Sequence, residues 1–306
     1  MKPKATLSGL TTEETNPASR NLDAKSALQI ARIINAEDAK VATAVKRALP
    51  QIAKAIDVIA DSLKRGGRLI YVGAGTSGRI AALDASECPP TFNTDPKMVQ
   101  FVIAGGERAL GRAVEANEDS PELGEKAIAE KKPGKKDVVV GIAASGRTPF
   151  TIAAVEYARK KGAKTIAVAC NRNSPLEKAA HLAIVAEVGP EAISGSTRMK
   201  AGTAQKMILN TLSTGAMTRL GYVYGNLMVN VHLKNEKLVE RGVSILQRAT
   251  GVSQERAAAG LKAAGNRVPV ALVMLKAGIT RTGAEQALKT SHANVRQALH
   301  HLKPGS

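Results

Sequence analysis

The chain has few aromatic residues and almost no cysteine. Aromatic side chains make up 2% of its 306 residues, and Trp is absent. Its hydrophobic core therefore has to be built from Ala, Val, Ile and Leu. The two cysteines, Cys88 and Cys170, are too few and too far apart for a disulfide framework or a cysteine-rich zinc site. The five His residues form no metal-spaced cluster, and we expect no bound metal.

Long apolar runs are missing as well. No run approaches the roughly 18 to 20 apolar residues that cross a bilayer. The first ten residues also lack the apolar core of a signal peptide. We therefore expect a soluble, cytoplasmic protein with no membrane partner.

Acidic residues are outnumbered by basic ones. The chain has 44 Lys and Arg against 26 Asp and Glu, which gives a formal charge of +18. Such a charge suits an anionic ligand, a nucleic acid or a lysine-rich solvated surface. Because no aromatic residues are interleaved with the basic ones for base stacking, we expect no nucleic-acid partner.

Five short apolar segments alternate with helical patterns in the middle of the chain. Apolar strands separated by helices indicate a parallel sheet covered on both faces. The predicted fold class is α/β: a doubly wound, mostly parallel five-stranded sheet with an N-terminal helical arm and a C-terminal three-helix module. The predicted strands are 69–72, 98–104, 137–143, 164–170 and 181–186. The predicted domains are an arm with helices (1–58), the sheet domain (59–222), a connecting helix (223–249) and the C-terminal module (250–306).

A glycine-rich loop, GAGTSG at residues 73–78, follows the first predicted strand and begins a helix. It satisfies the dinucleotide pattern G-x-G-x-x-G. However, the next strand ends in Ile103-Ala104-Gly105-Gly106, without the acidic residue that a dinucleotide site needs. The hydroxyls of Thr76 and Ser77, beside helix N–H groups, instead suit a phosphate ester or a sugar. A dinucleotide site and a purely structural turn remain the alternatives.

A second loop strengthens the phosphate interpretation. It contains Ser145, Gly146, Arg147 and Thr148, follows the third strand, and precedes Pro149 at the start of a helix. Both loops leave carboxyl ends of strands in one parallel sheet. We therefore expect both on one rim, near the topological switch point where such sheets bind ligands.

Several motifs resemble those of a known family. GAGTSGR and ASGRTP resemble the sugar isomerase (SIS) fold, which is flavodoxin-like and binds phosphosugars. DASECPPTF, TEETNPASRNLD and GSTRMKAGTAQK are similar to motifs of the N-acetylmuramic acid 6-phosphate etherases, lyases of peptidoglycan amino-sugar recycling. The resemblance spans nearly the whole chain. It implies removal of D-lactate from the C3 ether of a phosphorylated amino sugar, with no cofactor.

The resemblance also implies site residues. It matches Glu87 to the acid that protonates the departing ether oxygen, and Glu118 to the second carboxylate, which we assign as the base. Asp84 is the alternative to Glu87 and Glu115 the alternative to Glu118, because each lies three residues away on the same helical face. Cys88 is more plausible as a packed residue than as a nucleophile.

The motif at 195–206 is implied to border the site, with Ser196 and Lys200 as candidate substrate contacts beside Gly75, Thr76, Ser77 and the 145–148 loop. A solvated basic helix face is the alternative. The resemblance further implies a homodimer with shared active sites. A non-catalytic sugar-phosphate sensor, like the related glucokinase regulatory protein, is the alternative function. A sugar-phosphate-responsive transcription regulator is disfavoured, because the extra helical module is C-terminal.

Overall fold

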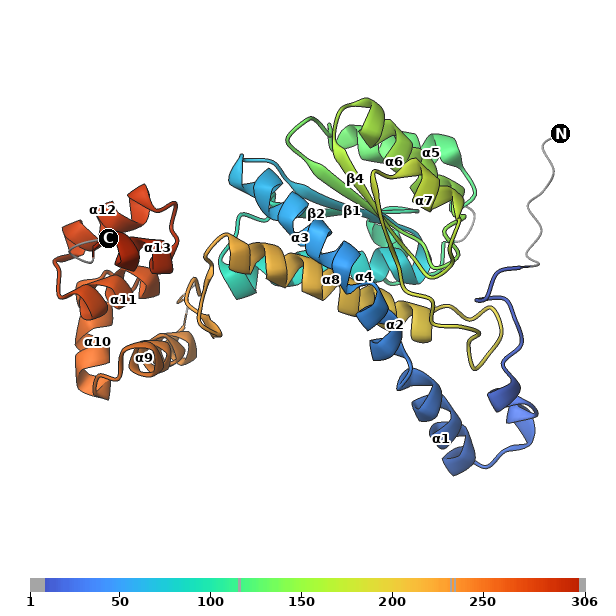
Figure 1. Ribbon diagram of the computed structural model, residues 1–306, viewed down its shortest axis with the longest axis horizontal. Coiled ribbons are helices and arrows are strands. Elements are labelled where there is room, and N and C mark those ends of the chain that lie inside the picture. Colours follow the sequence, from blue (N-terminus) through green and yellow to red (C-terminus); the bar gives the residue numbers. More distant parts are fainter. Residues whose placement is uncertain (1–8, 115–116, 232, 234, 303–306) are drawn as a thin grey trace. The chain divides into compact units, whose positions relative to one another are not determined.

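A computed structural model describes residues 9–114, 117–231, 233 and 235–302 (Figure 1). The chain divides into two compact units. The first comprises residues up to Ser86 together with Pro96–Ser213, and the second comprises Glu87–Asp95 and the residues from Thr214 on. Two long helices, α4 (Gly75–Phe92) and α8 (Lys200–Arg219), each contribute residues to both units.

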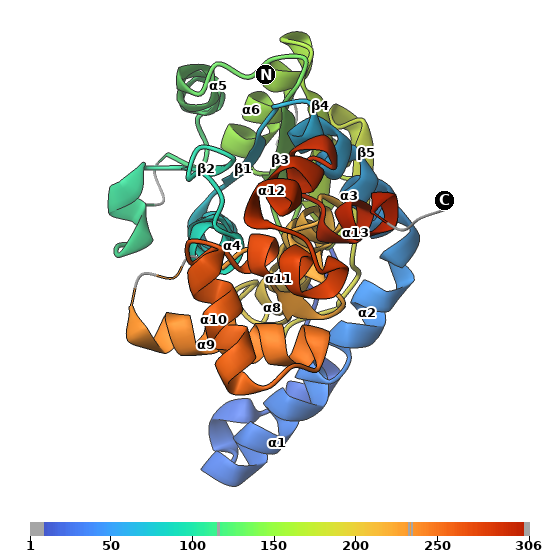
Figure 2. The same ribbon diagram turned by 90° about the vertical axis from the view of Figure 1, so that its left-hand side faces the viewer.

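A five-stranded sheet is the centre of the first unit. Its order is β2-β1-β3-β4-β5, and every neighbouring pair is parallel (Figure 2). This confirms the predicted α/β fold with a doubly wound parallel sheet. The strands are β1 (Leu69–Gly73), β2 (Val99–Ile103), β3 (Val138–Ile142), β4 (Lys164–Ala169) and β5 (Leu182–Val185).

Helices cover both faces of this sheet because its central strands are apolar on both faces. All residues of β1 and β3 are buried. Helix α6 (Pro149–Lys160) contacts β1, β3 and β4, whereas α3 (Leu49–Lys64) contacts β1, β3 and β5. Figure 1 shows these two helices on opposite faces. The close fit of α6 depends on Gly141, where a Cβ would lie 2.5 Å from a methyl carbon of Val155.

Further helices belong to the first unit. Pro50 lies in the first turn of α3, a position that suits proline. The other elements are the 3-10 helices η1 (Pro17–Ser19), η2 (Leu22–Ala24) and η3 (Glu107–Leu110), and the α-helices α1 (Ala27–Asp38), α2 (Val41–Arg47), α5 (Pro121–Glu130) and α7 (Pro175–Ala179).

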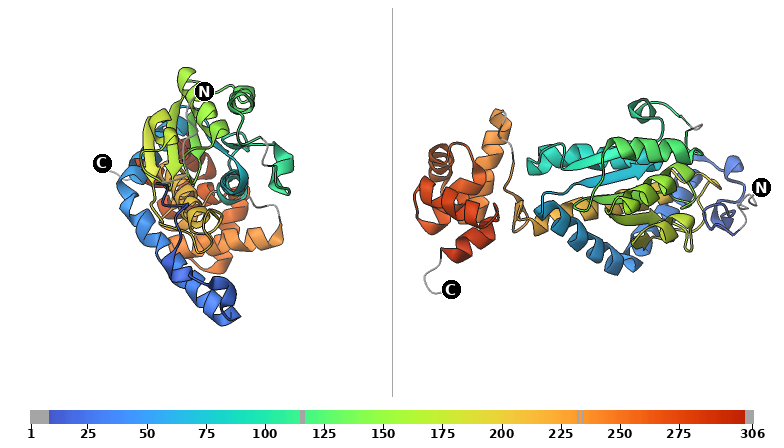
Figure 3. Two further views of the ribbon diagram at one scale, coloured as in Figure 1. Left: turned by 90° about the vertical axis from the view of Figure 1, so that its right-hand side faces the viewer. Right: turned by 90° about the horizontal axis from the view of Figure 1, so that it is seen from above.

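The second unit contains a hairpin and a helical bundle with its own apolar core (Figure 3, orange to red). Among the described residues, four helices follow residue 250, whereas the sequence predicts three. The chain turns before the fourth, because His292 and Ala293 have positive φ and Asn294 caps a new helix. The elements are β6 (Val223–Tyr224), β7 (Leu227–Met228), α9 (Glu236–Thr250), α10 (Gln254–Ala263), α11 (Val268–Ala277), α12 (Arg281–Thr290) and α13 (Val295–His301).

Within the described ranges, no helix combines the length and the apolar composition that crossing a bilayer requires.

Candidate active site

The strand order brings the two predicted ligand loops together. Strands β1 and β3 are neighbours in register, with Gly73 opposite Ile142. The chain leaves β1 toward β2 on one side and leaves β3 toward β4 on the other. The carboxyl ends of β1 and β3 therefore flank the topological switch point, where ligands bind in sheets of this kind.

The first loop turns sharply from β1 into α4. Gly75 has a φ of +51°, a conformation that favours glycine. A Cβ at Gly78 would lie 2.5 Å from Ile103 Cγ1, so glycine permits the helix to begin close to β2. Thr76 is half-buried and Ser77 is buried. Their hydroxyls thus belong to the first turn of α4, whose N–H groups have no intrahelical partners.

The second loop is held by two backbone hydrogen bonds, from the N–H of Gly146 to Ala143 O and from the N–H of Leu176 to Gly146 O, both at 3.0 Å. Gly146 has a φ of +68°, and a Cβ there would lie 2.3 Å from Ser174 Oγ. The backbone N–H of Arg147 donates to Ser145 Oγ at 3.2 Å. Thr148 is the residue before α6, yet its side chain makes no capping bond to the helix. The loop therefore presents two hydroxyl-bearing residues and a helix N-terminus at the rim.

Glu118 lies between the two loops. Its Oε1 is 3.1 Å from the position that a Cβ on Gly75 would occupy. Its backbone carbonyl accepts a hydrogen bond from the N–H of Phe150, in the first turn of α6, at 3.1 Å. The structure thus brings a carboxylate to the glycine loop from a segment that has no regular secondary structure. Glu115, the alternative to Glu118, lies outside the described residues.

Asp84 and Glu87 lie in different surroundings on α4. Asp84 is buried, and it accepts hydrogen bonds from Tyr71 Oη at 2.8 Å, Asn210 Nδ2 at 2.6 Å and Ser213 Oγ at 3.0 Å. This carboxylate ties β1 and α8 to α4. Glu87, by contrast, is exposed. Asp84 therefore has a structural task, and Glu87 is the carboxylate of this pair that a substrate could reach.

The motif at 195–206 borders the first loop through the start of α8. A Cβ at Gly202 would lie 3.4 Å from Thr76 Cγ2, so the first turns of α8 pack against the glycine loop. Ser196 is half-buried in the segment before this helix, and its N–H donates to Ile193 O at 3.0 Å. Arg198 and Lys206 are exposed.

Lys200 is held inside the protein. Its side chain is 2% exposed, and its Nζ lies 2.6 Å from Glu37 Oε2. Burial raises the pKa of Glu37, but hydrogen bonds from Lys200, Lys40 and Asn16 outweigh it and lower this pKa to about 2. The backbone N–H groups of Lys200 and Ala201 donate to the two carboxylate oxygens of Glu191, both at 2.9 Å. Lys200 therefore fixes the start of α8 to α1.

The N-terminal arm reaches the same rim, a contact that the sequence interpretation did not assign to any residue. Asn171, which follows β4, accepts from Thr11 Oγ1 at 3.0 Å and donates to Thr12 Oγ1 at 3.1 Å. Its amide also donates to Ala144 O at 3.1 Å, directly before the second loop. The sequence did contain a signal for Asn171 at this rim, because it is the first polar residue after an apolar strand.

The cysteines are not placed for covalent chemistry. Cys88 and Cys170 are 2% and 1% exposed. Burial, with the charge of Glu191, raises the pKa of Cys170 to about 12, so its thiol stays neutral. In the described part of the chain, no three side chains of His, Cys, Asp or Glu gather as metal ligands would.

Comparison with known families finds SIS domains across the sheet unit. The family model of the glucokinase regulatory protein N-terminal SIS domain matches residues 51–159, and that of the SIS domain matches residues 132–214. Together the matched ranges include both loops and Glu118.

Curated relatives are similar over almost their whole length. The chain is 47% identical to the N-acetylmuramic acid 6-phosphate etherase of Clostridium beijerinckii, covering 97% of both chains. It is 49% identical to that of Photorhabdus laumondii, covering 97% of this chain and 98% of the relative. It is 50% identical to that of Yersinia pestis, covering 96% and 99%.

Solved structures share the fold. A phosphoheptose isomerase from Francisella tularensis superposes with a TM-score of 0.50 at 19% identity, covering 63% of this chain and all of that one. A candidate phosphosugar isomerase involved in capsule formation, from Bacteroides fragilis, gives 0.51 at 18% identity, covering 68% and 98%. At such identities the likeness concerns the fold alone.

Proposed function

The chain belongs to the N-acetylmuramic acid 6-phosphate etherase family, and we propose that it is a lyase that removes D-lactate from the C3 ether of N-acetylmuramic acid 6-phosphate. The other product is N-acetylglucosamine 6-phosphate. One observation carries the proposal for this chain: the carboxylate of Glu118 lies beside Gly75, between two hydroxyl-bearing loops at the switch point. That arrangement offers a phosphate site and a base within the span of one sugar.

The chemistry needs one base and one acid. In the open-chain sugar, the C2–H bond lies next to the C1 aldehyde, so a carboxylate can remove this proton. Glu118 takes the C2 proton, the C3–O bond breaks, and the ether oxygen leaves as D-lactate with a proton from Glu87. Water then adds its oxygen to C3 of the unsaturated aldehyde, and a proton returns to C2. The part of the protein in each step is proton transfer, which two carboxylates can do.

The two loops hold different parts of the substrate. Ser145, Gly146, Arg147 and Thr148 bring hydroxyls, a guanidinium and the N-terminus of α6, a combination that suits a phosphate dianion. Gly75, Thr76 and Ser77 then face the sugar near Glu118. Ser196 borders the site from the start of α8. Lys200 acts as a positioning residue, since its ammonium group is bound to Glu37.

The position of Glu87 along α4 supports a site shared between two chains. Glu87 follows Gly75 by twelve residues in one continuous helix, which corresponds to a rise of roughly 18 Å. A hexose 6-phosphate held at Gly75 is too short to reach that carboxylate. We therefore assign the acid to the partner's Glu87 in a homodimer with shared sites.

An exposed helix face supports the dimer. Leu83 precedes Glu87 by one turn, so the two share a face of α4. Leu83 is 50% exposed in the single chain. A large apolar side chain beside the required acid is what a subunit interface would cover.

Both cysteines are thiols rather than disulfide partners, which suits the reducing cytoplasm where we place this enzyme.

The test is release of D-lactate from N-acetylmuramic acid 6-phosphate by purified protein, measured with a stereospecific lactate dehydrogenase. We expect stoichiometric lactate and N-acetylglucosamine 6-phosphate. Binding of the sugar phosphate without any turnover would contradict the lyase and favour a sensor.

A further inference from the structure

The excess of positive charge is concentrated in the C-terminal part of the chain. Residues 214–306 contain 13 Lys and Arg against 4 Glu and no Asp, a net charge of +9. Half of the total of +18 thus belongs to fewer than a third of the residues. The proposed reaction assigns no task to this region.

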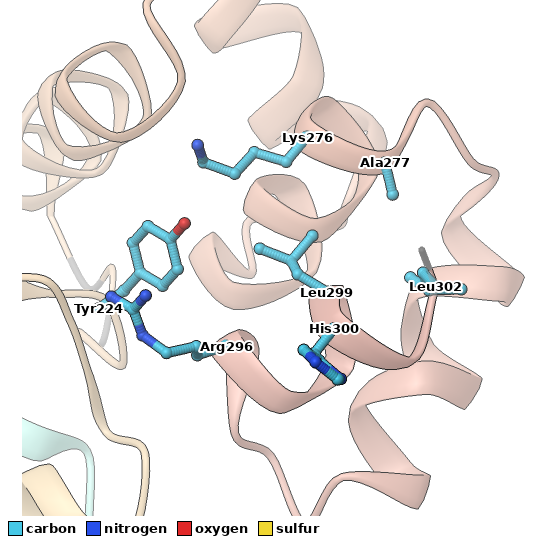
Figure 4. Close-up of a pocket in the computed structure, with 7 residues that line it drawn as sticks. All are labelled: Tyr224, Lys276, Ala277, Arg296, Leu299, His300 and Leu302. Carbon is cyan, nitrogen blue, oxygen red and sulfur yellow. The ribbon is translucent and has the colours of Figure 1, made fainter. Parts of the chain in front are cut away.

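A cavity of about 610 Å³ lies within the second unit (Figure 4). Its volume falls in the range of roughly 300 to 1,000 Å³ that is usual for small-molecule sites. It is lined by Tyr224, Lys276, Arg296, Leu299, His300 and Leu302. These residues come from the hairpin and from the ends of α11 and α13.

Two cations share the ring of Tyr224. Lys276 Nζ lies 5.7 Å from the ring centroid, and Arg296 Cζ lies 5.2 Å from it. In Figure 4 both side chains extend toward the ring from different helices. Stacking on one rigid ring positions the cations, which otherwise would be mobile on the surface.

In the part of the chain that the structure describes, no carboxylate lines the cavity beside these charges. Among the described residues, neither Lys276 nor Arg296 forms an ion pair, and no Asp or Glu lines the cavity. The lining also contains Tyr224 and the ring of His300, while Leu299 and Leu302 supply an apolar wall. Such a lining is complementary to an anion attached to a small apolar body.

We propose that the cavity around Tyr224 is a second small-molecule site, which takes a ligand with a phosphate ester or carboxylate group and a short apolar portion. The site lies in the C-terminal helical unit and uses none of the residues assigned to the reaction. A nucleic acid fits less well, because one ring in a cavity offers no row of stacking platforms.

The experiment titrates the full-length protein with phenyl phosphate, benzoate, inorganic phosphate and benzyl alcohol in a calorimeter. We expect phenyl phosphate to bind at least tenfold more tightly than inorganic phosphate and benzyl alcohol, since each of these lacks one half of the ligand. The ratio of phenyl phosphate to benzoate then distinguishes a phosphate-ester site from a carboxylate site.

Variants locate the binding. Lys276→Gln and Arg296→Gln should each weaken the phenyl phosphate affinity about tenfold. Lys262→Gln and Arg248→Gln, which remove exposed charges of the same unit away from the cavity, should leave it within twofold. Thr148→Val, at the other proposed phosphate site, should also leave it unchanged.

Three results would overturn the proposal: absence of phenyl phosphate binding, binding that survives both cavity substitutions, or displacement of bound phenyl phosphate by duplex DNA at lower concentration. Because the readout is binding in the second unit, the outcome does not depend on whether the protein releases lactate.

Discussion

Glu118 Oε1 lies 3.1 Å from the point that a Cβ on Gly75 would occupy, so the proposed base rests against the backbone of the glycine loop. Gly75 is therefore required twice, once for its φ of +51° and once for the space it leaves to the carboxylate.

A methyl group at this position tests the contact. We expect Gly75→Ala to lower kcat/KM at least tenfold, about 1.4 kcal/mol of transition-state stabilisation, because the carboxylate has to move. The left-handed backbone should also cost roughly 1 to 2 kcal/mol of unfolding free energy. Steady-state kinetics and urea denaturation measure the two effects.

Gly251→Ala is the matched control. Gly251 also has a positive φ, +78°, but a Cβ there meets nothing within 4 Å. The Gly251→Ala variant should lose as much unfolding free energy as Gly75→Ala and keep its activity. Equal activity of the two alanine variants would contradict the placement of Glu118.

Glu87→Gln and Glu118→Gln should each lower kcat by a factor of 10² to 10⁴, which is typical for loss of a general acid or base. Stability should change by less than about 0.5 kcal/mol in Glu87→Gln, because this side chain is exposed. The decisive step is to mix the two inactive variants and let their subunits exchange.

In a mixed dimer, one site pairs an intact Glu118 with the partner's intact Glu87. Random exchange makes half of the dimers mixed, each with one working site of two, so about a quarter of wild-type activity should return. If both carboxylates act within one chain, no activity returns, and the assignment of the acid to the partner is wrong.

Asp84→Asn separates the structural carboxylate from the catalytic one. Three hydrogen bonds from Tyr71, Asn210 and Ser213 meet at this buried group, and bonds to a charged acceptor contribute about 1.5 to 3 kcal/mol each. We expect a loss of at least 2 kcal/mol in urea denaturation. The activity of the protein that remains folded should stay within a few-fold of wild type.

Asp38→Asn, an exposed carboxylate on α1, serves as the control and should change neither quantity. A collapse of kcat in Asp84→Asn at unchanged stability would instead make Asp84 the acid.

The buried pair of Glu37 and Lys200 makes the unfolding free energy depend on pH in the acidic range. Because the pKa of Glu37 is lowered from 4.5 to about 2, its contribution is complete above pH 4.5 and is lost as pH falls toward about 2. Wild type should therefore lose more unfolding free energy across this window than Glu37→Gln does.

At neutral pH, Lys200→Met should cost about 3 to 5 kcal/mol, since it leaves a buried carboxylate without its main partner. The double variant with Glu37→Gln should recover most of that loss. If the unfolding free energies of wild type and Glu37→Gln fall in parallel as the pH is lowered, the pair contributes nothing to stability.

Most of the fold could be predicted from local sequence patterns. Apolar segments bounded by glycine predicted all five strands to within about two residues, because buried parallel strands are apolar throughout. The hairpin at 223–228 was missed, since two-residue strands leave almost no pattern beyond the turn at Gly225-Asn226.

The site depended on long-range contacts, which a pattern cannot contain. Nothing around Asp84 in the sequence indicates that Asn210 and Ser213 bind it, and nothing near Lys200 points to Glu37. Glu118 lies in an irregular segment, so only the family resemblance predicted its role. The loops themselves could be predicted, because glycine and hydroxyl residues at strand ends have a local physical reason.

The most direct test of the proposed reaction is turnover of N-acetylmuramic acid 6-phosphate in ¹⁸O-labelled water, with both products analysed by mass spectrometry. Elimination followed by hydration predicts one ¹⁸O at C3 of N-acetylglucosamine 6-phosphate and none in the ether-derived hydroxyl of D-lactate. Label in that lactate hydroxyl, with the original oxygen retained on C3, would mean that the bond on the lactyl side breaks and would contradict the roles given to Glu118 and Glu87.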